Sequence, residues 1–223
     1  MEEGLVPYAP LPYLEGRPGY LAPEIMSVTA KLVAEARFPT QFGDFTIHGV
    51  EAVVEGKREE LVAVRMGSLT DGPPPLLRIH SQCLTGDVFH SLRCDCRAQL
   101  EMALRAVAEE GRGLVIYELK EGRGIGLVNK IRAYELQDHG ADTVEANELL
   151  GFKADLRDYL VHAHILRLLG VEAVRLLSNN PDKIAALENA GIRVVERVPI
   201  IVDPLETTAF YMQTKKEKMG HLL

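Results

Sequence analysis

The sequence contains no tryptophan, few other aromatic residues, no long apolar run and no excess of basic residues. No apolar stretch approaches the roughly 20 residues that span a bilayer, so the composition does not predict a membrane protein. The net charge of −7 argues against general binding to nucleic acid, which requires a basic face. It still permits binding of a nucleotide, because a small local group of Arg and Lys can hold a triphosphate.

Cysteine is also scarce, and the three residues Cys83, Cys94 and Cys96 all lie in one short stretch. Three thiols cannot all pair as disulfides, and no secretory pattern opens the chain, so we expect a reducing, cytoplasmic compartment. Structural zinc sites use four protein ligands, whereas catalytic zinc keeps three and leaves one position for water. The cluster therefore predicts an open zinc site. Two alternatives are three unrelated buried thiols and a closed site with His80 or His90 as fourth ligand.

The first part of the chain differs in composition from the rest. Residues 1–29 contain five prolines and three tyrosines, which predicts an arm without regular structure, laid over the surface or over a partner subunit. Residues 30–223 are predicted to form a single domain.

The first half of this domain has a β pattern. Short apolar or alternating runs at residues 46–48, 52–54 and 61–66 are separated by glycines, which predicts strands cut by Gly43, Gly49 and Gly56. After a turn-rich loop, residues 76–79 form a predicted buried strand that delivers the cysteine segment.

The second half alternates between the two periodicities. We predict helices from about residue 100 to 110 and at 127–139, 159–169, 181–189 and 207–219, and strands at 114–117, 174–177 and 192–198. The predicted fold is therefore α/β, with an N-terminal β-rich part leading into a three-layer half that has a mixed, mainly parallel sheet.

A glycine-rich turn, Gly122-x-Gly124-x-Gly126, lies between a predicted strand and helix, where backbone N–H groups and the helix dipole bind phosphate. It matches neither the dinucleotide fingerprint nor the P-loop, and a tight strand-to-helix connection explains it equally well. Arg123 adds a guanidinium suited to phosphate oxygens, and Glu121 is able to accept hydrogen bonds from N–H groups of a ligand.

Three other polar groups have ordinary structural explanations beside a functional one. Asparagine and proline at residues 179–181 are sufficient to start a helix, although Lys183 would then point to a phosphate near the helix N-terminus. Asp155 and Arg157 fit a charged helix start, or can converge in the turn before it. Tyr134 lies on a predicted helix and fits a tyrosine buried in the core.

Together these segments resemble GTP cyclohydrolase II, the enzyme that opens riboflavin synthesis. The matching segments occur in the same order and are Arg78–Asp87, Cys94–Gln99, Glu121–Leu127, Asn129–Tyr134, Asp142–Asn147, Leu150–Tyr159, Asn179–Lys183 and Lys218–Leu223. The resemblance covers roughly residues 32–223. It implies a homodimeric enzyme that uses zinc, and Mg²⁺ with the GTP phosphates. The implied products are formate, pyrophosphate and 2,5-diamino-6-ribosylamino-4(3H)-pyrimidinone 5′-phosphate.

The resemblance also implies a role for each matching residue. Zinc would be held by Cys83, Cys94 and Cys96, and the catalytic residues would be Asp155 as proton acceptor, Arg157 at the α-phosphate, and Tyr134. The family assigns the arginine as nucleophile, but a guanidinium stays protonated and suits charge stabilisation better. The implied GTP contacts are Arg78, Ile79, His80, Ser81, Gln82, Gln99, Glu121, Gly122, Arg123, Thr143, Ser178 and Lys183.

Several positions depart from the family pattern near the predicted metal and nucleotide. Gln82 replaces the usual Glu and cannot carry a proton, while Leu119, Lys120 and Arg97 are also unusual, and Ser178 replaces Thr. These changes leave two alternatives. One is a related zinc hydrolase that stops at the formamide or prefers another nucleotide, and the other is a zinc-containing nucleotide-binding protein without turnover. The retained catalytic residues favour an enzyme.

Overall fold

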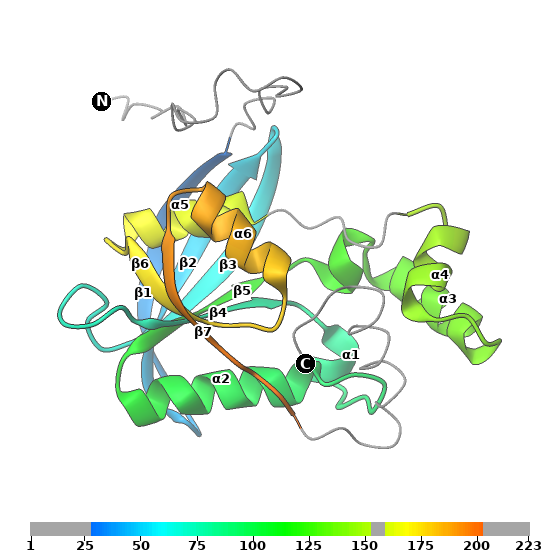
Figure 1. Cartoon of the computed structure of the whole chain (residues 1–223), viewed down its shortest axis with the longest axis horizontal. Helices are drawn as coiled ribbons and strands as arrows, with labels where there is room; N and C mark the ends of the chain where they lie inside the picture. Colours follow the sequence, from blue (N-terminus) through cyan, green and yellow to red (C-terminus); the bar gives the residue numbers. More distant parts are fainter. Residues whose placement is uncertain (1–27, 153–158, 203–223) are drawn as a thin grey trace.

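A seven-stranded mixed sheet forms the centre of the protein, with strand order β1-β2-β3-β5-β4-β6-β7 (Figure 1). The computed structural model describes residues 28–152 and 159–202. The predicted closing helix and nearly all of the predicted arm lie outside these residues. The strands are β1 (Val28–Thr40), β2 (Gly43–Val54), β3 (Lys57–Met66), β4 (Leu76–Ser81), β5 (Gly113–Glu118), β6 (Ala173–Leu177) and β7 (Arg193–Val198). The helices are α1 (Leu84–Asp87), α2 (Cys96–Glu110), the 3₁₀ turn η1 (Glu121–Gly124), α3 (Leu127–Asp138), α4 (Thr143–Leu149), α5 (Leu160–Leu168) and α6 (Pro181–Asn189).

The N-terminal part is an antiparallel meander of three long strands, β1 to β3, which continues antiparallel onto β5. Gly43 and Gly56 lie at the two hairpin ends and have positive φ angles of 141° and 77°. The predicted break at Gly49 is wrong. Its backbone avoids the positive φ range, so it stays in the ladder of β2, paired with Ala34 and Val62.

The C-terminal part confirms the α/β prediction. β4 pairs in parallel with β5 on one side and with β6 on the other, and β6 pairs in parallel with β7. Helix α2 connects β4 to β5, and α6 connects β6 to β7. Parallel neighbours require such crossovers, which explains why strand and helix patterns alternate here in the sequence.

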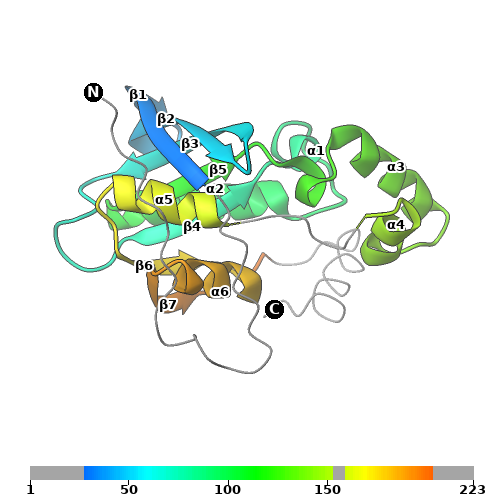
Figure 2. The same ribbon diagram turned by 90° about the horizontal axis from the view of Figure 1, so that it is seen from above.

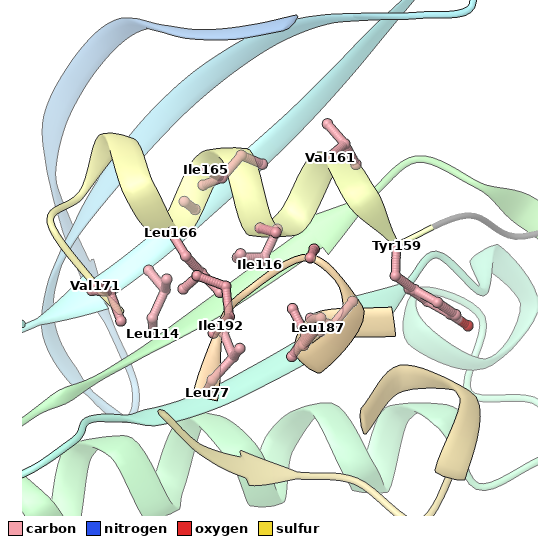
Figure 3. Packing of buried hydrophobic residues seen from close by; sticks show 14 of the residues in the cluster. Leu77, Leu114, Ile116, Tyr159, Val161, Ile165, Leu166, Val171, Leu187 and Ile192 are labelled. Carbon is pink, nitrogen blue, oxygen red and sulfur yellow. The ribbon is translucent and has the colours of Figure 1, made fainter. Parts of the chain in front are cut away.

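Helices cover both faces of the sheet and make three layers. On one face, α5 and α6 pack onto the strands through fully buried Leu77, Ile116, Ile165, Leu166 and Leu187 (Figure 3). On the other face, α2 presents buried residues that include Ala103 and Val107, at the helical spacing predicted from sequence. Figure 1 shows α5 and α6 on one side of the sheet and α2 on the other, and in the view from above α2 lies behind α5 (Figure 2). In the described ranges, no helix is long and apolar enough to cross a membrane.

The carboxyl ends of β4 and β5 lead to the predicted site. β4 runs into the first cysteine and α1, while β5 runs into η1, and α3 and α4 project beyond this edge of the sheet (Figure 1). No helix was predicted for α4, although Asp142 and Glu145 form a capping box at its start. The Asp-x-x-Glu spacing was a usable signal for that helix.

Candidate active site

The three cysteines come together in space. Cys83 lies two residues after the end of β4, while Cys94 precedes α2 and Cys96 is its first residue. Their Sγ atoms all lie within 4.8 Å of one another, and those of Cys83 and Cys94 are 3.6 Å apart. Thiolates are the soft ligands that zinc binds in proteins. The cluster can therefore hold a metal ion, as the sequence predicts.

The helix α1 is shaped around this cluster. A Cβ atom on Gly86 would lie only 2.9 Å from the Cys94 Sγ and 3.1 Å from the Cys83 Sγ. Real Cβ atoms do not approach other atoms so closely, so any larger residue would displace the thiols. The space between α1 and the sulfur atoms therefore fits a metal-binding thiol cluster.

Neither histidine proposed as a fourth ligand belongs to the cluster. Within the described ranges, the potential metal ligands that converge here are the three cysteines alone. His80 is buried, its Nε2 lies 3.2 Å from Asp87 Oδ1, and its ring stacks on Tyr117. His90 contacts the guanidinium of Arg97 instead. The described residues therefore form neither of the two closed sites that the sequence analysis considered.

A lysine balances the charge of the cluster. Hydrogen bonds from Cys94 and Cys96, aided by the ammonium group of Lys130, hold the pKa of Cys83 far below its usual range. Lys130 Nζ lies 3.0 Å from the Cys83 Sγ. The pKa of Cys94 is raised to about 11 by its hydrogen bond to Cys83, and hydrogen bonds to Cys83 and Cys94 raise the pKa of Cys96 well above its usual value. Among the three thiols, Cys83 is therefore the one whose surroundings most favour loss of the proton.

A pocket opens directly beside the thiols. It joins the ends of β4 and β5, the turn η1 and the helices α3 and α4. Its lining residues are Ser81, Gln82, Cys83, Arg93, Cys94, Cys96, Glu121, Gly122, Arg123, Ile125, Lys130, Ala133, Tyr134, Gln137, Thr143 and Asn147. Metal ligands, a carboxylate, a guanidinium and a phenol thus meet in one cavity.

The glycine-rich turn forms one wall of the pocket. Gly122 has a φ of 60°, and a Cβ there would lie 3.0 Å from an Ile125 side-chain carbon, so both backbone conformation and space favour glycine. Arg123 shares this left-handed conformation, which is uncommon for a residue with a side chain. Its Nη1 is buried and finds no hydrogen-bond partner among the described residues. An anion in the pocket would satisfy it.

Glu121 is buried at the start of the same turn and its carboxylate is well anchored. It accepts hydrogen bonds from the backbone N–H groups of Leu84 and Gly122, at 2.7 and 2.9 Å, and from Lys130 at 2.7 Å. A carboxylate offers about four acceptor positions. One position therefore remains for a ligand.

Tyr134 and Thr143 also line the pocket. The Tyr134 hydroxyl lies 3.0 Å from Thr85 Oγ1, and burial raises the pKa of the phenol, so it remains a donor at neutral pH. The guanidinium of Arg93 lies 4.9 Å from the centre of the Tyr134 ring. Thr143 is the first residue of α4.

Six of the predicted GTP contacts lie outside the pocket lining: Arg78, Ile79, His80, Gln99, Ser178 and Lys183. Arg78 donates to Leu177 O at 2.9 Å and to Gln99 Oε1 at 2.6 Å. Lys183 donates to Ile79 O at 2.8 Å, and Ser178 Oγ accepts from the Asn180 N–H. These side chains connect the ends of β4 and β6 to α2 and α6 within the protein.

The residues that depart from the family pattern also fall into two groups, those that line the pocket and those that do not. Gln82 lines the pocket. Arg97 turns to Glu101, at 2.7 Å, and Lys120 pairs with Glu59 at 3.0 Å. Only Gln82 of these three is therefore placed to meet a ligand in the pocket.

Sequence reasoning missed two basic side chains of the pocket, Arg93 and Lys130. Lys130 lies four residues before Tyr134 on α3 and thus on the same helix face, which was an available signal. Arg93 stands in the irregular stretch before Cys94, where periodicity gives no information. Asp155 and Arg157 lie outside the described residues.

A three-layer α/β protein in which three thiols that could hold a metal ion line a polar pocket has the kind of site that enzymes use. Residues 31–199 match the family model described as GTP cyclohydrolase II. The chain is 56% identical over 193 residues to a GTP cyclohydrolase-2 of Escherichia fergusonii, covering 86% of this chain and 96% of that one. It is 57% identical over 191 residues to a GTP cyclohydrolase-2 of Actinobacillus succinogenes, covering 86% and 87%.

A third relative is longer. The riboflavin biosynthesis protein RibBA of Aquifex aeolicus is 56% identical over 191 residues, which are 85% of this chain and 47% of that one. The present chain belongs to the GTP cyclohydrolase II family and is an enzyme.

Proposed function

We propose that this enzyme converts GTP to formate, pyrophosphate and 2,5-diamino-6-ribosylamino-4(3H)-pyrimidinone 5′-phosphate, as the first step of riboflavin synthesis. One observation carries the proposal. The three thiols and the Glu121-Gly122-Arg123 turn line a single pocket, so a metal, a base-recognising carboxylate and a phosphate-binding group face the same ligand.

The metal that best suits this site is zinc. Three convergent thiols, a glycine that leaves room for them and the absence of a fourth ligand from the described cluster match an open site. Zinc held by Cys83, Cys94 and Cys96 would supply a Lewis acid able to activate water at neutral pH, and C8 of guanine would be the position attacked. Mg²⁺ would accompany the GTP phosphates, because it prefers phosphate oxygens to an all-protein cage.

The pocket side chains can divide the work of binding. The remaining acceptor position on Glu121 suits a guanine N–H group, and the unpartnered Nη1 of Arg123 suits a phosphate oxygen. Tyr134, as a neutral phenol, can donate a hydrogen bond to the reacting ring or to water. Ser81, Gln82 and Thr143 complete the contacts.

The remaining residues that the family resemblance implicates also have proposed roles. Asp155 would accept a proton, and Arg157 would stabilise charge on the α-phosphate as pyrophosphate leaves. Arg78, Ile79, His80, Gln99, Ser178 and Lys183 would shape the floor below the nucleotide. We further propose a cytoplasmic homodimer in which residues 30–223 form one catalytic domain and residues 1–29 an arm.

Product analysis tests the proposed function. Purified protein with one zinc per chain would be incubated with GTP and Mg²⁺, and formate, pyrophosphate and nucleotide products followed by mass spectrometry. We expect all three proposed products in equal amounts. A formamide that accumulates without formate would show a reaction that stops early. GTP left unchanged by the zinc-loaded protein would overturn the proposal.

A further inference from the structure

Lys130 lies between the two functional halves of the pocket. Its ammonium group is 3.0 Å from the Cys83 Sγ and 2.7 Å from Glu121 Oε1, and its side chain comes from α3, a different element from either partner. The lysine and glutamate side chains are only 12% and 8% exposed. Solvent therefore screens these contacts little.

The charges of the groups explain why a cation is needed there. A divalent metal with three thiolates carries one net negative charge, and the carboxylate of Glu121 adds another nearby. Partly buried charges of like sign repel each other strongly unless a cation lies between them. Lys130 is the basic side chain that contacts both Cys83 and Glu121.

We propose that Lys130 is a positioning residue that joins the metal site to the base-recognising carboxylate, by donating to a metal-ligating thiolate and to Glu121 at the same time. The ammonium group offsets the negative charge of the metal site and fixes the Glu121 carboxylate beside it. This inference rests on the proposed function for the nature of the metal and ligand, but its contacts do not depend on that function.

The neighbouring side chains support a fixed position for the ammonium group. It lies 5.7 Å from the centre of the Tyr134 ring, within the range of a cation–π contact. The ammonium group is therefore held by two hydrogen-bond acceptors, the Cys83 Sγ and Glu121 Oε1, and by an aromatic ring.

Zinc affinity tests the proposal without relying on turnover. Zinc binding would be measured by competition with a chromophoric chelator for the parent, Lys130→Met, Lys130→Gln and Lys130→Arg. Outer-shell partners of metal ligands typically contribute about 10–100-fold in metal affinity. We expect a loss of this size in Lys130→Met and Lys130→Gln, and substantial recovery in Lys130→Arg, which keeps the charge.

Arg132→Met is a matched control. Arg132 lies on the same helix, is exposed and donates to Asn129 Oδ1 at 3.0 Å, so the variant loses one positive charge without touching the cluster. Its zinc affinity should equal that of the parent. An equal loss in Arg132→Met and Lys130→Met would show a general charge effect and overturn the proposal.

Two further measurements separate a positioning role from a merely structural one. In the cobalt-substituted protein, loss of a donor to sulfur should move the thiolate-to-metal charge-transfer band to longer wavelength in Lys130→Met but not in Arg132→Met. Glu121→Gln should weaken zinc binding in the parent and have little further effect in Lys130→Met, because the carboxylate acts on the thiolate through the lysine.

The outcomes distinguish this proposal from the proposed function. If the parent binds zinc and Lys130→Met binds it equally tightly with an unchanged cobalt spectrum, Lys130 has no such role, and the proposed function stands. If the parent itself binds no zinc, the proposed function fails first. Circular dichroism melting of each variant would confirm that the protein compared is folded.

Discussion

The pocket and the strand ends beneath it use polar residues in opposite ways. In the pocket, Arg123 keeps a buried Nη1 without a partner among the described residues, and Glu121 keeps one acceptor position for a ligand. Beneath it lies a second set, which we call the buried strand-end group: Arg78, His80, Gln99, Ser178 and Lys183. Most of their polar atoms pair with one another, with the side chain of Asp87 or with the backbone, although His80 Nδ1, like Arg123 Nη1, has no hydrogen-bond partner among the described residues.

The difference shows that membership in a family motif does not fix what a side chain touches. Arg78, Ser81 and Cys83 lie within six residues of one another, yet the first is committed inside the protein and the other two line the pocket. A buried polar group must be paired, because leaving it unpaired is costly. A buried polar group can find its hydrogen-bond partner within the protein or in a bound ligand. Substitutions in the first class should affect stability, and substitutions in the second should affect activity.

The largest expected contrast is between two arginines. Arg123→Met should lower kcat/KM for GTP by about 100-fold or more, as removal of one oriented donor to a charged group commonly does. Its free energy of unfolding should change by less than about 0.5 kcal/mol. Arg78→Met should lower the free energy of unfolding by about 2–5 kcal/mol, because it leaves Gln99 Oε1 and Leu177 O without their donor.

Urea unfolding and steady-state kinetics on the same preparations measure both effects. An Arg78→Met protein with the stability of the parent and a large loss in GTP affinity would contradict the proposed difference between the two regions. Such a result would place Arg78 on the substrate.

The pH dependence of the free energy of unfolding provides a second test of the buried polar residues, through His162 on α5. Complete burial lowers the pKa of His162 to about 4, although Glu118 opposes the shift and Lys183 and Lys120 add to it. The unfolded chain binds this proton below about pH 6.5 and the folded chain does not, so stability falls as pH falls from 6.5 toward 4.

We therefore expect His162→Gln to lose less stability than the parent between pH 7.5 and 5.0, by about 2 kcal/mol at 1.36 kcal/mol per unit of pKa. Urea unfolding at the two pH values gives the difference. His80 and His48, whose pKa values are also lowered by burial, keep some dependence in both proteins. Equal slopes in parent and variant would show that His162 takes up its proton in the folded state.

A substitution at Gly86 tests whether the space beside the thiols is needed for metal binding. Gly86→Ala should lower zinc affinity by about tenfold or more, because the added Cβ would meet the sulfur atoms of Cys94 and Cys83, and displacement of ligands loosens metal binding. Gly49→Ala is the control, since its added Cβ meets only ordinary contacts of 3.6 and 3.7 Å. Chelator competition on both variants measures the effect, and unchanged affinity in Gly86→Ala would mean that α1 moves freely away from the cluster.

The smallest expected effect concerns Gln82, which lines the pocket where the family usually has Glu. An amide keeps the shape and an acceptor oxygen, so we expect Gln82→Glu to change the single-turnover rate of formate release by less than tenfold. A proton-carrying carboxylate would contribute about 10²–10⁴-fold. A rise of tenfold or more would show that the parent lacks a needed acid–base group.

The periodicity of the sequence was sufficient for most of the fold. Val107 and Ala103 mark the buried face of α2, and the strands β5, β6 and β7 lie where apolar runs are bounded by turns. Gly49 misled the prediction because a glycine can also remain extended within a strand. The helix α4 is short and polar, so its capping box was the one sequence signal that could have predicted it.

The site was predictable to a different degree. Clustered cysteines are informative because few other arrangements suit three thiols, and the structure brings them together. Sequence spacing could not show that Arg78 donates across 99 residues to Leu177, or that Lys130 reaches Cys83 from another helix. Those contacts depend on how β4, β6 and α3 pack, which no local pattern encodes.

The central claim is that the three thiols hold one zinc that ring opening requires. The most direct measurement is formate release from GTP as metal-free protein is titrated with zinc, with Cys83→Ser as the control. The account predicts a rate that rises in proportion to bound zinc, saturates at one zinc per chain, and stays at background in Cys83→Ser. Full formate release by a metal-free preparation would contradict it.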